Sequence, residues 1–403
     1  MILIINSGSS SIKFRLYDIQ DKNKPKDILE GLAERIGVDG FWSFKYDSTK
    51  HEFNDKLPNH KVALKLILDK LIEMKIIENY NDIEGVGFRV VHGGTVSSSS
   101  LISDDIYSSI VDSTKLAPLH NPGALVAIDA VKAIMPDAKL VASFDTAFHQ
   151  TIPKENFLYT TPIEWYENHG VRKYGFHGIS YQYILKNLST ILKKDCRKVN
   201  AIVCHLGNGA SMAVIKEGLS FDTTMGLTPL AGLMMGTRSG DIDPSIIEYM
   251  SKELKKDVVE ITTMLNKNSG LKGISKISSD MRDVREAFYG GNQNAKIAIH
   301  KYTTIVADFM VKYANYLNGE IDAIVFTAGI GENSDFIRTQ VLDRVNILGL
   351  ELDEKLNAYS NDYEDYKLIS TNKSKSKVYA IKTNEELMIC LDTISKIYLR
   401  STK

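Results

Sequence analysis

A repeated strand–turn–strand pattern constrains the fold of this chain more than any other feature. The apolar, β-branched run Ile2–Ile5 ends in the polar turn Asn6–Ser11, and a second strand is expected directly after it. The same plan returns at Ala201–Cys204, which is followed by the turn His205–Ser211 and a returning strand at Met212–Ile215. Solenoid repeats are only about 20 to 50 residues long, so a solenoid is excluded. The pattern predicts a duplicated domain.

Strands and helices alternate along the rest of the chain. Further buried strands are predicted at Lys139–Phe144 and Ala323–Phe326. A helix is predicted at His60–Ile77, where apolar residues recur at spacings of three and four. This alternation favours an α/β architecture. At about 150 residues per domain, 403 residues make two or three domains, with a split expected near residue 150.

Composition excludes several classes of function. The formal charge of −1 gives no global field that would attract nucleic acid or an anionic membrane. Three scattered cysteines are too few for a disulfide framework, and the apolar N-terminal run is too short for a signal peptide. We therefore expect a cytoplasmic protein with no nucleic-acid or membrane partner, in which local charge holds any anionic ligand.

Glycine-rich turns follow three of the predicted strands. A missing Cβ lets backbone N–H groups approach an anion closely. The third turn, Ala328–Asn333, is expected to leave a strand and enter a helix near Ser334–Leu342. One such turn is usually an ordinary hairpin, but three at strand ends favour a phosphate site. Neither a Walker sequence nor G-x-G-x-x-G is present, which argues against a P-loop enzyme and an ordinary dinucleotide site.

Two arginines and two histidines lie in similar glycine-rich segments. Arg89 and Arg238 have glycines nearby, so bulky neighbours do not cover them, although a surface salt bridge is the alternative for each. His120 precedes Asn-Pro-Gly, which predicts a helix start with the asparagine as its cap. His177 lies between glycines, and neither histidine belongs to a zinc-hydrolase H-E-x-x-H pair. A structural role is the alternative for both histidines.

Two acidic residues are further candidates. Asp145 stands just past a predicted strand, where α/β folds place ligand sites, although a simple strand-end turn is the alternative. Glu385 lies where Thr383 and Glu386 have the spacing of a capping box, and an acid in a first helical turn is commonly structural.

Taken in chain order, these motifs closely resemble the acetate kinase family over essentially the whole chain. The matching segments are Asn6-Ser-Gly-Ser-Ser-Ser with Lys13, Arg89-Val-Val-His-Gly-Gly, Leu119-His-Asn-Pro, Phe144-Asp-Thr-Ala-Phe-His, Tyr174-Gly-Phe-His-Gly, His205-Leu-Gly-Asn-Gly, Gly236-Thr-Arg-Ser-Gly-Asp, Gly329-Ile-Gly-Glu-Asn and Thr383-Asn-Glu-Glu. The chain departs from the family at Ala328, where glycine is usual, and at Lys382, where proline is usual.

The resemblance implies an actin-like ATPase fold, in which two duplicated, ribonuclease H-like α/β domains enclose an interdomain nucleotide cleft. The expected domains are residues 1–148 with 384–403, on the acyl and phosphate side, and residues 149–383, which bind nucleotide. The implied reaction is the reversible conversion of ATP and acetate to ADP and acetyl phosphate. A homodimer and bound Mg²⁺, with Mn²⁺ as the alternative ion, are implied as well.

The resemblance also implies a role for each site residue. Arg89 and Arg238 would clamp acetate and the transferred group, and His177 would hydrogen-bond the equatorial phosphoryl oxygens. Acetate is already ionised at neutral pH, so Asp145 is a catalytic residue without being a general base. The catalytic residues would be Arg89, His120, Asp145, His177 and Arg238, and the acetate pocket Arg89, Val91, Leu119, Phe176 and Pro229. ATP would be surrounded by Lys13, His205, Leu206, Gly207, Asn208, Gly209, Asp280, Met281, Arg282, Gly329, Ile330, Gly331, Glu332 and Asn333. Asn6 and Glu385 would hold the metal ion.

Two alternatives stay open at this point. A propionate or butyrate kinase of the same family would share nearly every motif. A non-catalytic actin-like nucleotide-binding protein would share the phosphate turns, but it would not need Arg89, His120, His177 and Arg238 as a set.

Overall fold

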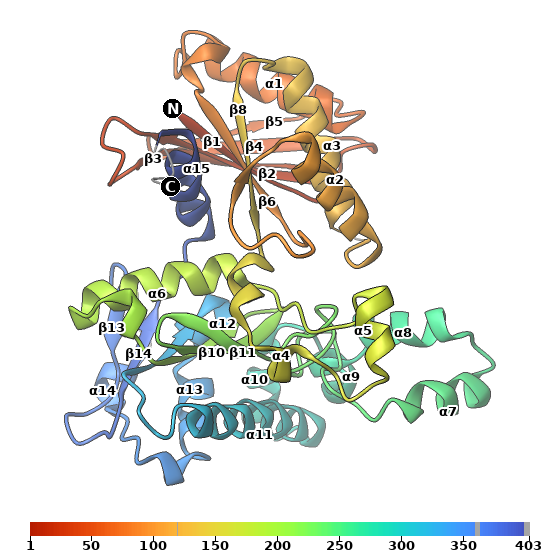
Figure 1. Cartoon of the computed structure of the whole chain (residues 1–403), viewed down its shortest axis with the longest axis vertical. Helices are drawn as coiled ribbons and strands as arrows, with labels where there is room; N and C mark the ends of the chain where they lie inside the picture. The colour runs from red at the N-terminus through yellow and green to blue at the C-terminus, as the bar shows by residue number, and fades with distance from the viewer. Residues whose placement is uncertain (119, 359–362, 399–403) are drawn as a thin grey trace. The chain divides into compact units, whose positions relative to one another are not determined.

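The chain folds as two compact units. A computed structural model describes residues 1–118, 120–358 and 363–398. The first unit comprises residues 1–150 and the C-terminal segment from residue 384, and the second comprises residues 151–383 (Figure 1). Each unit contains one β-sheet with helices packed on it.

The first unit contains an eight-stranded sheet in the order β5-β4-β3-β2-β1-β6-β8-β7. Its strands are β1 Ile2–Ser7, β2 Ser11–Asp18, β3 Lys26–Glu34, β4 Phe41–Tyr46, β5 Thr49–Phe53, β6 Gly85–Val90, β7 Ser100–Leu101 and β8 Lys139–Phe144. β1 runs antiparallel to β2 and parallel to β6, which in turn runs parallel to β8. The strands predicted at both ends of the first glycine turn and at Lys139–Phe144 are confirmed.

Among the described residues, four α-helices belong to this unit. They are α1 His60–Glu73, α2 Asp104–Asp112, α3 Asn121–Ile134 and α15 Glu385–Tyr398. Helices α3 and α15 pack on the sheet, and α1 and α2 pack on α3. The Asn59 side chain caps α1 by accepting a hydrogen bond from the N–H of Val62. The helix is shorter than the predicted His60–Ile77 because Lys75 adopts a left-handed φ of 58°. Three short 3₁₀ turns, Tyr80–Asp82, Ser113–Lys115 and Ala147–Thr151, complete the regular elements.

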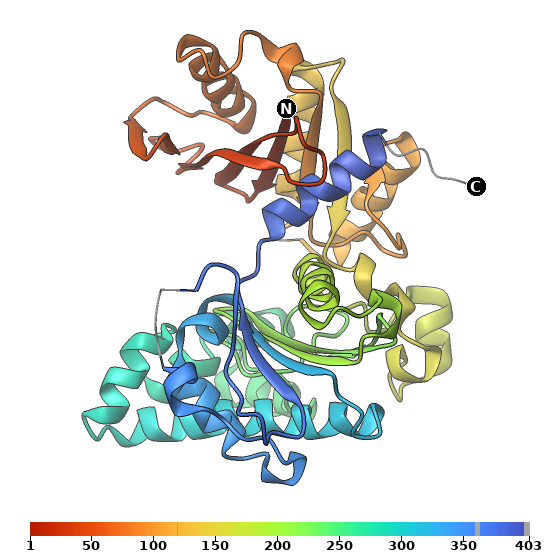
Figure 2. The same ribbon diagram turned by 90° about the vertical axis from the view of Figure 1, so that its left-hand side faces the viewer.

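The C-terminal helix α15 packs directly on the parallel strands of the first unit, as Figures 1 and 2 show. Glycines on β6 permit this close approach. A Cβ atom at Gly87 would lie 2.4 Å from Thr393 Oγ1 and 2.8 Å from Ile389 Cγ2. The packing places Glu385, the first residue of α15, in the same unit as Arg89 on β6.

The second unit contains a six-stranded sheet in the order β11-β10-β9-β12-β14-β13. Its strands are β9 Ala201–Leu206, β10 Ala210–Lys216, β11 Leu219–Thr223, β12 Ala323–Thr327, β13 Tyr366–Leu368 and β14 Lys377–Ile381. β9 runs antiparallel to β10 and parallel to β12, which runs parallel to β14. This repeats the arrangement of β2, β1, β6 and β8, so the predicted α/β fold with duplicated domains is confirmed.

Helices cover both faces of the second sheet. α6 Gly178–Leu192 lies on one face and α11 Gln293–Tyr316 on the other (Figures 1 and 2). The remaining helices are α4 Lys154–Phe157, α5 Ile163–His169, α7 Ser245–Leu254, α8 Val258–Lys267, α9 Gly270–Ser275, α10 Met281–Tyr289, α12 Ala328–Asn333, α13 Asp335–Leu342 and α14 Glu354–Asn357, with 3₁₀ turns at Cys196–Lys198 and Asn346–Leu348. Within the described ranges, no helix is long and apolar enough to cross a membrane.

The third glycine-rich segment differs from the prediction. The helix expected near Ser334–Leu342 is confirmed as α13, which begins at Asp335, but Ala328–Asn333 before it is the short helix α12 and not a turn. The Glu332 side chain stabilises the start of α12, because Oε1 accepts a hydrogen bond of 2.8 Å from the N–H of Ala328. Sequence patterning missed this helix because a glycine-rich run has low intrinsic helix propensity.

Candidate active site

A partly buried ion pair lies at the carboxyl ends of two parallel strands of the first unit. The register of β6 and β8 pairs Val90 with Phe144 and so places Arg89 close to Asp145. Arg89 Nε donates to Asp145 Oδ1 at 3.0 Å, and Nη2 donates to Oδ2 at 2.8 Å. The Asp145 side chain is 2% exposed. This bidentate geometry fixes the plane of the guanidinium.

Glu385 lies beside this pair, with Oε2 3.9 Å from Arg89 Nε. Burial acts to lower the pKa of Arg89, but the negative charges of Asp145 and Glu385 outweigh it and raise that pKa. Burial also raises the pKa of Glu385, and the charge of Arg89 offsets this effect only in part. Two carboxylates and one guanidinium give this cluster a net negative charge, so a further cation would be stabilised beside it.

Asn6 and Lys13 lie on the strands next to this cluster. The two residues are directly opposite in the register of β1 and β2. Lys13 Nζ contacts the carboxylate of Glu386, the residue after Glu385. Burial acts to raise the pKa of Glu386, but the hydrogen bond and charge of Lys13 lower it overall.

The donor set of this region fits a magnesium ion. Among the described residues, no three His, Cys, Asp or Glu side chains are grouped as a metal site. Mg²⁺ usually takes only one or two carboxylates from the protein and completes its shell with water and substrate phosphates. The hard oxygens of Glu385 and Asn6 suit that ion, and the half-buried Glu385 carboxylate is 20% exposed and so remains accessible to it.

The structure corrects the predicted start of α3. His120, not Asn121, occupies the N-cap position, and its side chain makes no capping hydrogen bond. Asn121 is fully buried, and its side chain holds His92 by accepting from the backbone N–H at 3.1 Å and donating to the carbonyl at 2.9 Å. His120 is exposed next to the helix start. Val91 is half-buried just after β6, and Leu119 lies outside the described residues.

In the second unit, His177 is the N-cap residue of α6 and has a left-handed φ of 59°. Its Nδ1 lies 2.8 Å from Ser211 Oγ. Its ring stacks on His205, with centroids 4.0 Å apart. In this orientation Nε2 faces the glycine turn between β9 and β10, because a Cβ atom at Gly209 would lie 3.7 Å from it.

Arg238 and His177 converge on Gly209. A Cβ atom at Gly209 would lie 3.7 Å from both Arg238 Nη1 and His177 Nε2. Arg238 Nη1 also donates to Pro229 O at 3.3 Å, and burial lowers the pKa of Arg238. The backbone supports this convergence, because the N–H of Gly236 donates to Asn208 O at 2.9 Å. A glycine turn flanked by a guanidinium and an imidazole, both of which can donate hydrogen bonds, is suited to binding phosphoryl oxygens.

The residues of α12 that were predicted to contact ATP differ in the direction they face. Gly329 faces open space, since a Cβ atom there would have no heavy atom within 4 Å. Glu332 points inward instead, and its Oε1 accepts from the N–H groups of Ala328 at 2.8 Å and Thr383 at 3.0 Å. Ala328 has a left-handed φ of 64°, a conformation that costs about 1–2 kcal/mol for a residue other than glycine. The usual glycine of the family would avoid this cost.

The segment that precedes α15 also differs from the prediction. The side chain of Asn384, not Thr383, caps this helix by accepting from the N–H of Leu387 at 2.9 Å. Thr383 Oγ1 instead lies 2.8 Å from Ser180 Oγ, which itself lies 2.9 Å from His205 Nδ1. The N–H of Lys382 donates to Asp365 O at 2.8 Å, a bond that proline at this position could not make.

Of the three residues predicted to contact ATP at α10, only Arg282 borders a cavity of about 760 Å³. Asp280 caps α10, and its carboxylate pairs with Arg282, whose side chain is 86% exposed. Arg282, Tyr289 and Phe336 line the cavity between α10 and α13. Several predicted site side chains are instead packed in the interior, so only their backbone could reach a ligand. These are Phe176, Leu206 and Met281.

The roles of Ser211, Ser180 and Thr383 were missed by sequence reasoning. Ser211 is the hydrogen-bond partner of His177, Ser180 is that of His205, and Thr383 in turn bonds to Ser180. Ser211 could have been noticed, because it closes the second glycine turn. Ser180 carries no local signal, and Thr383 was noticed only as a possible helix cap, because the contact between them joins segments far apart in the sequence.

Comparisons with known proteins agree on one family. The sequence model of the acetokinase family matches residues 1–391. An acetate kinase from Mesoplasma florum is 61% identical over 395 residues, which cover 98% of this chain and 99% of that protein. The crystal structure of an acetate kinase from Porphyromonas gingivalis is 36% identical with a TM-score of 0.92, and that of a propionate kinase from Francisella tularensis is 42% identical with a TM-score of 0.90. In both cases the match covers 98% of this chain and 99% of the other chain.

Proposed function

The chain belongs to the acetokinase family and is therefore a kinase, and we propose that its reaction is the reversible transfer of the γ-phosphoryl group of ATP to acetate, which gives ADP and acetyl phosphate. ATP and ADP are the nucleotides that this family implies. The relatives named acetate kinase reach 61% identity, so a propionate or butyrate kinase is not favoured.

The convergence of Arg238 and His177 on Gly209 is the observation that supports this proposal most directly. Two anions must meet in this reaction, and phosphoryl transfer depends mainly on positioning and on stabilising negative charge. Arg238 supplies a positive charge, and His177 supplies a ring nitrogen oriented by Ser211 and His205. Both would hydrogen-bond the transferred phosphoryl group, beside the backbone of the glycine turn.

Arg89 would bind the carboxylate of acetate. Asp145 holds its guanidinium bidentately and thereby fixes its orientation, while Asp145 itself does not have to take a proton from a substrate that is already ionised. Val91 of the first unit and Pro229 of the second are each half-buried and would contact the acetate methyl group. Phe176, whose side chain is buried in the second unit, would back this pocket on the side of Pro229. His120 would assist Arg89 from the start of α3.

Mg²⁺, with Mn²⁺ as the alternative ion, would be held by Glu385 and Asn6. When bound, it would neutralise charge on the nucleotide phosphates. In the second unit, the segment His205–Gly209, the exposed face of α12 at Gly329 and the cavity beside Arg282 would contact the nucleotide. In the first unit, Lys13 would contact it. We propose direct in-line transfer, since a carboxylate acceptor needs no protein nucleophile.

We also propose residues 1–148 with 384–403 and residues 149–383 as the two functional domains, and a cytoplasmic homodimer as the state of the protein. Light scattering of the purified protein would measure its oligomeric state.

The decisive experiment mixes purified protein with ATP, Mg²⁺ and acetate, propionate or butyrate, and detects acyl phosphate with hydroxylamine. We expect acetate to give the highest kcat/KM. The absence of acyl phosphate with every acid would reject the kinase proposal, and a preference for butyrate would reject acetate as the substrate. Inversion at a chiral γ-phosphorus is expected for direct transfer, whereas retention would require a phosphorylated enzyme.

A further inference from the structure

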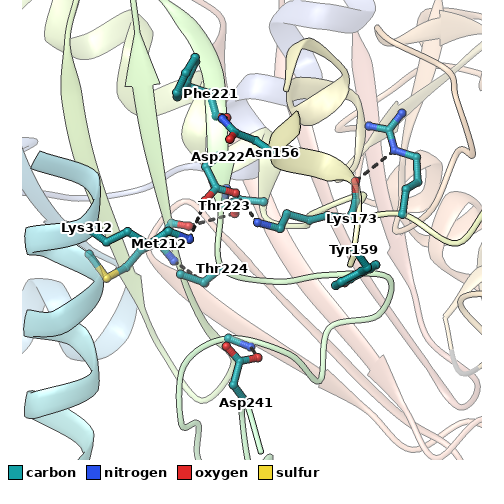
Figure 3. Close-up of polar contacts among 12 residues, drawn as sticks. Asn156, Tyr159, Lys173, Met212, Phe221, Asp222, Thr223, Thr224, Asp241 and Lys312 are labelled. Carbon is teal, nitrogen blue, oxygen red and sulfur yellow. Dashed lines mark hydrogen bonds and ion pairs between the residues drawn. The ribbon is translucent and has the colours of Figure 1, made fainter. Parts of the chain in front are cut away.

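A buried carboxylate in the second unit is shared by two lysines. Asp222 on β11 is 1% exposed, and its Oδ1 contacts Lys173 Nζ. Its Oδ2 accepts from Lys312 Nζ of α11 at 3.1 Å. Figure 3 shows the two lysines reaching Asp222 from opposite sides. The Lys173 side chain is 16% exposed and that of Lys312 is 43% exposed, so Lys173 makes the more buried of the two pairs.

Lys173 lies on the segment that leads to His177. The N–H groups of Tyr174 and Gly175 both donate to Gly226 O, at 3.1 and 3.2 Å. The chain then reaches His177, which starts α6. Lys173 is therefore a side-chain anchor of a short segment whose last residue would contact the phosphoryl group.

Asp222 lies at the start of the other segment of the site. After β11, the chain continues through Gly226 and Pro229 to Arg238. The N–H of Thr223 donates to Asp222 Oδ1 at 2.8 Å, so the same carboxylate oxygen binds the backbone of this segment and the Lys173 side chain. Arg238 returns to this segment through its bond to Pro229 O.

We propose that Asp222 and Lys173 are positioning residues that fix the distance between His177 and Arg238. Asp222 anchors the start of the Arg238 segment, and Lys173 joins the His177 segment to the same carboxylate. Because a displacement of about 1 Å can lower a rate on the order of 10²-fold, this anchor matters for catalysis without touching substrate. The inference rests on the proposed function, in which both groups act on one phosphoryl group.

Lys312 offers a matched control. It pairs with the same carboxylate, but it is on α11, which carries no residue of the proposed site. In Lys173→Met and in Lys312→Met, Asp222 keeps one lysine, so neither change leaves the buried carboxylate without a cation. The two variants therefore differ in one respect: Lys173→Met releases the segment that leads to His177, whereas Lys312→Met releases α11.

The experiment measures kcat, the KM values for acetate and ATP, and Tm for the unmodified protein and both variants. We expect Lys173→Met to lower kcat by roughly tenfold to a hundredfold with smaller changes in KM, because transition-state contacts are displaced. Lys312→Met should keep a kcat close to that of the unmodified protein at a similar Tm. Lys173→Arg, which retains the charge, should recover part of the lost kcat.

Equal losses of kcat in the two methionine variants, or a normal kcat in folded Lys173→Met, would overturn the positioning role. An inactive unmodified protein would instead reject the proposed function itself. If Lys173→Met does not fold, kcat is compared instead in Lys173→Gln and Lys312→Gln, which also remove the charge. A loss of kcat confined to the Lys173 variant supports the role, and equal values reject it.

Discussion

Adding one methyl group at Gly209 should separate catalysis from stability. In Gly209→Ala, the new methyl carbon would lie 3.7 Å from Arg238 Nη1 and His177 Nε2 and 3.8 Å from His177 Cε1, which are ordinary van der Waals distances. Gly209 is not among the glycines with positive φ, so alanine can adopt its backbone conformation. The protein should therefore fold, and the loss of unfolded-state freedom should stabilise it by about 0.4–1 kcal/mol.

The same methyl group would occupy the space that a phosphoryl oxygen needs. An oxygen that accepts a hydrogen bond from either nitrogen lies about 2.9 Å from it, so the oxygen and the methyl group compete for one place. Displacing the transferred group from preorganised donors should lower kcat on the order of 10²- to 10³-fold. The hydroxylamine assay at saturating ATP and acetate measures kcat, and thermal unfolding measures stability.

Gly290→Ala is the matched control for this change. Gly290 is the exposed C-cap residue of α10, with φ of −69°, and a Cβ atom there would meet its nearest heavy atom at 3.5 Å. This variant should keep a normal kcat. A normal kcat in folded Gly209→Ala would refute the reasoning, because Gly209 would then not face the transferred group.

Four further changes test other parts of the site. Arg238→Ala should lower kcat on the order of 10²- to 10³-fold. Its Tm should not fall, because burial lowers the pKa of Arg238 and holding its charge there carries a desolvation cost. A kcat near normal would show that Arg238 has only a structural role. Arg89→Ala should lose activity and also about 3–5 kcal/mol of stability, since the buried Asp145 carboxylate loses its counter-charge; an unchanged unfolding curve would contradict this. Burial raises the pKa of Glu332, so the folded state binds the proton of this carboxyl more tightly than the unfolded state does. The contribution of Glu332 to the free energy of unfolding therefore falls as pH rises above about 4.5. Glu332→Gln should accordingly raise Tm at pH 7 more than at pH 4.5, and equal shifts in the two unfolding curves would argue against it. Val91→Ala should narrow a preference for acetate over propionate of roughly tenfold, and an unchanged kcat/KM ratio would remove Val91 from the pocket.

The strand framework could be predicted from the sequence because its signals are local. Apolar β-branched runs predicted the strands that became β1, β8, β9 and β12, since such residues must be buried wherever the chain places them. Repetition of the strand–turn–strand plan predicted the duplicated domains for the same reason. Helix ends were predicted less well. Asn384 caps α15 in place of Thr383, and α12 occupies an expected turn. Thr383 and Glu332 instead make contacts far along the chain, Thr383 with Ser180 and Glu332 with the N–H of Thr383, which no local pattern could indicate.

The sequence by itself also determined the kinds of residue available for chemistry, namely arginines, histidines and acids placed among glycines or at strand ends. Their assigned roles stay predictions. Only the tertiary structure decided which of them meet: Arg89 pairs with Asp145, Arg238 and His177 converge on Gly209, and Glu332 turns inward. The ion pairs of Asp222 with Lys173 and Lys312 had no sequence signal at all. An ion pair forms between segments that the fold brings into contact, and its strength depends on distance and burial, neither of which is encoded by the order of residues in any short stretch of chain.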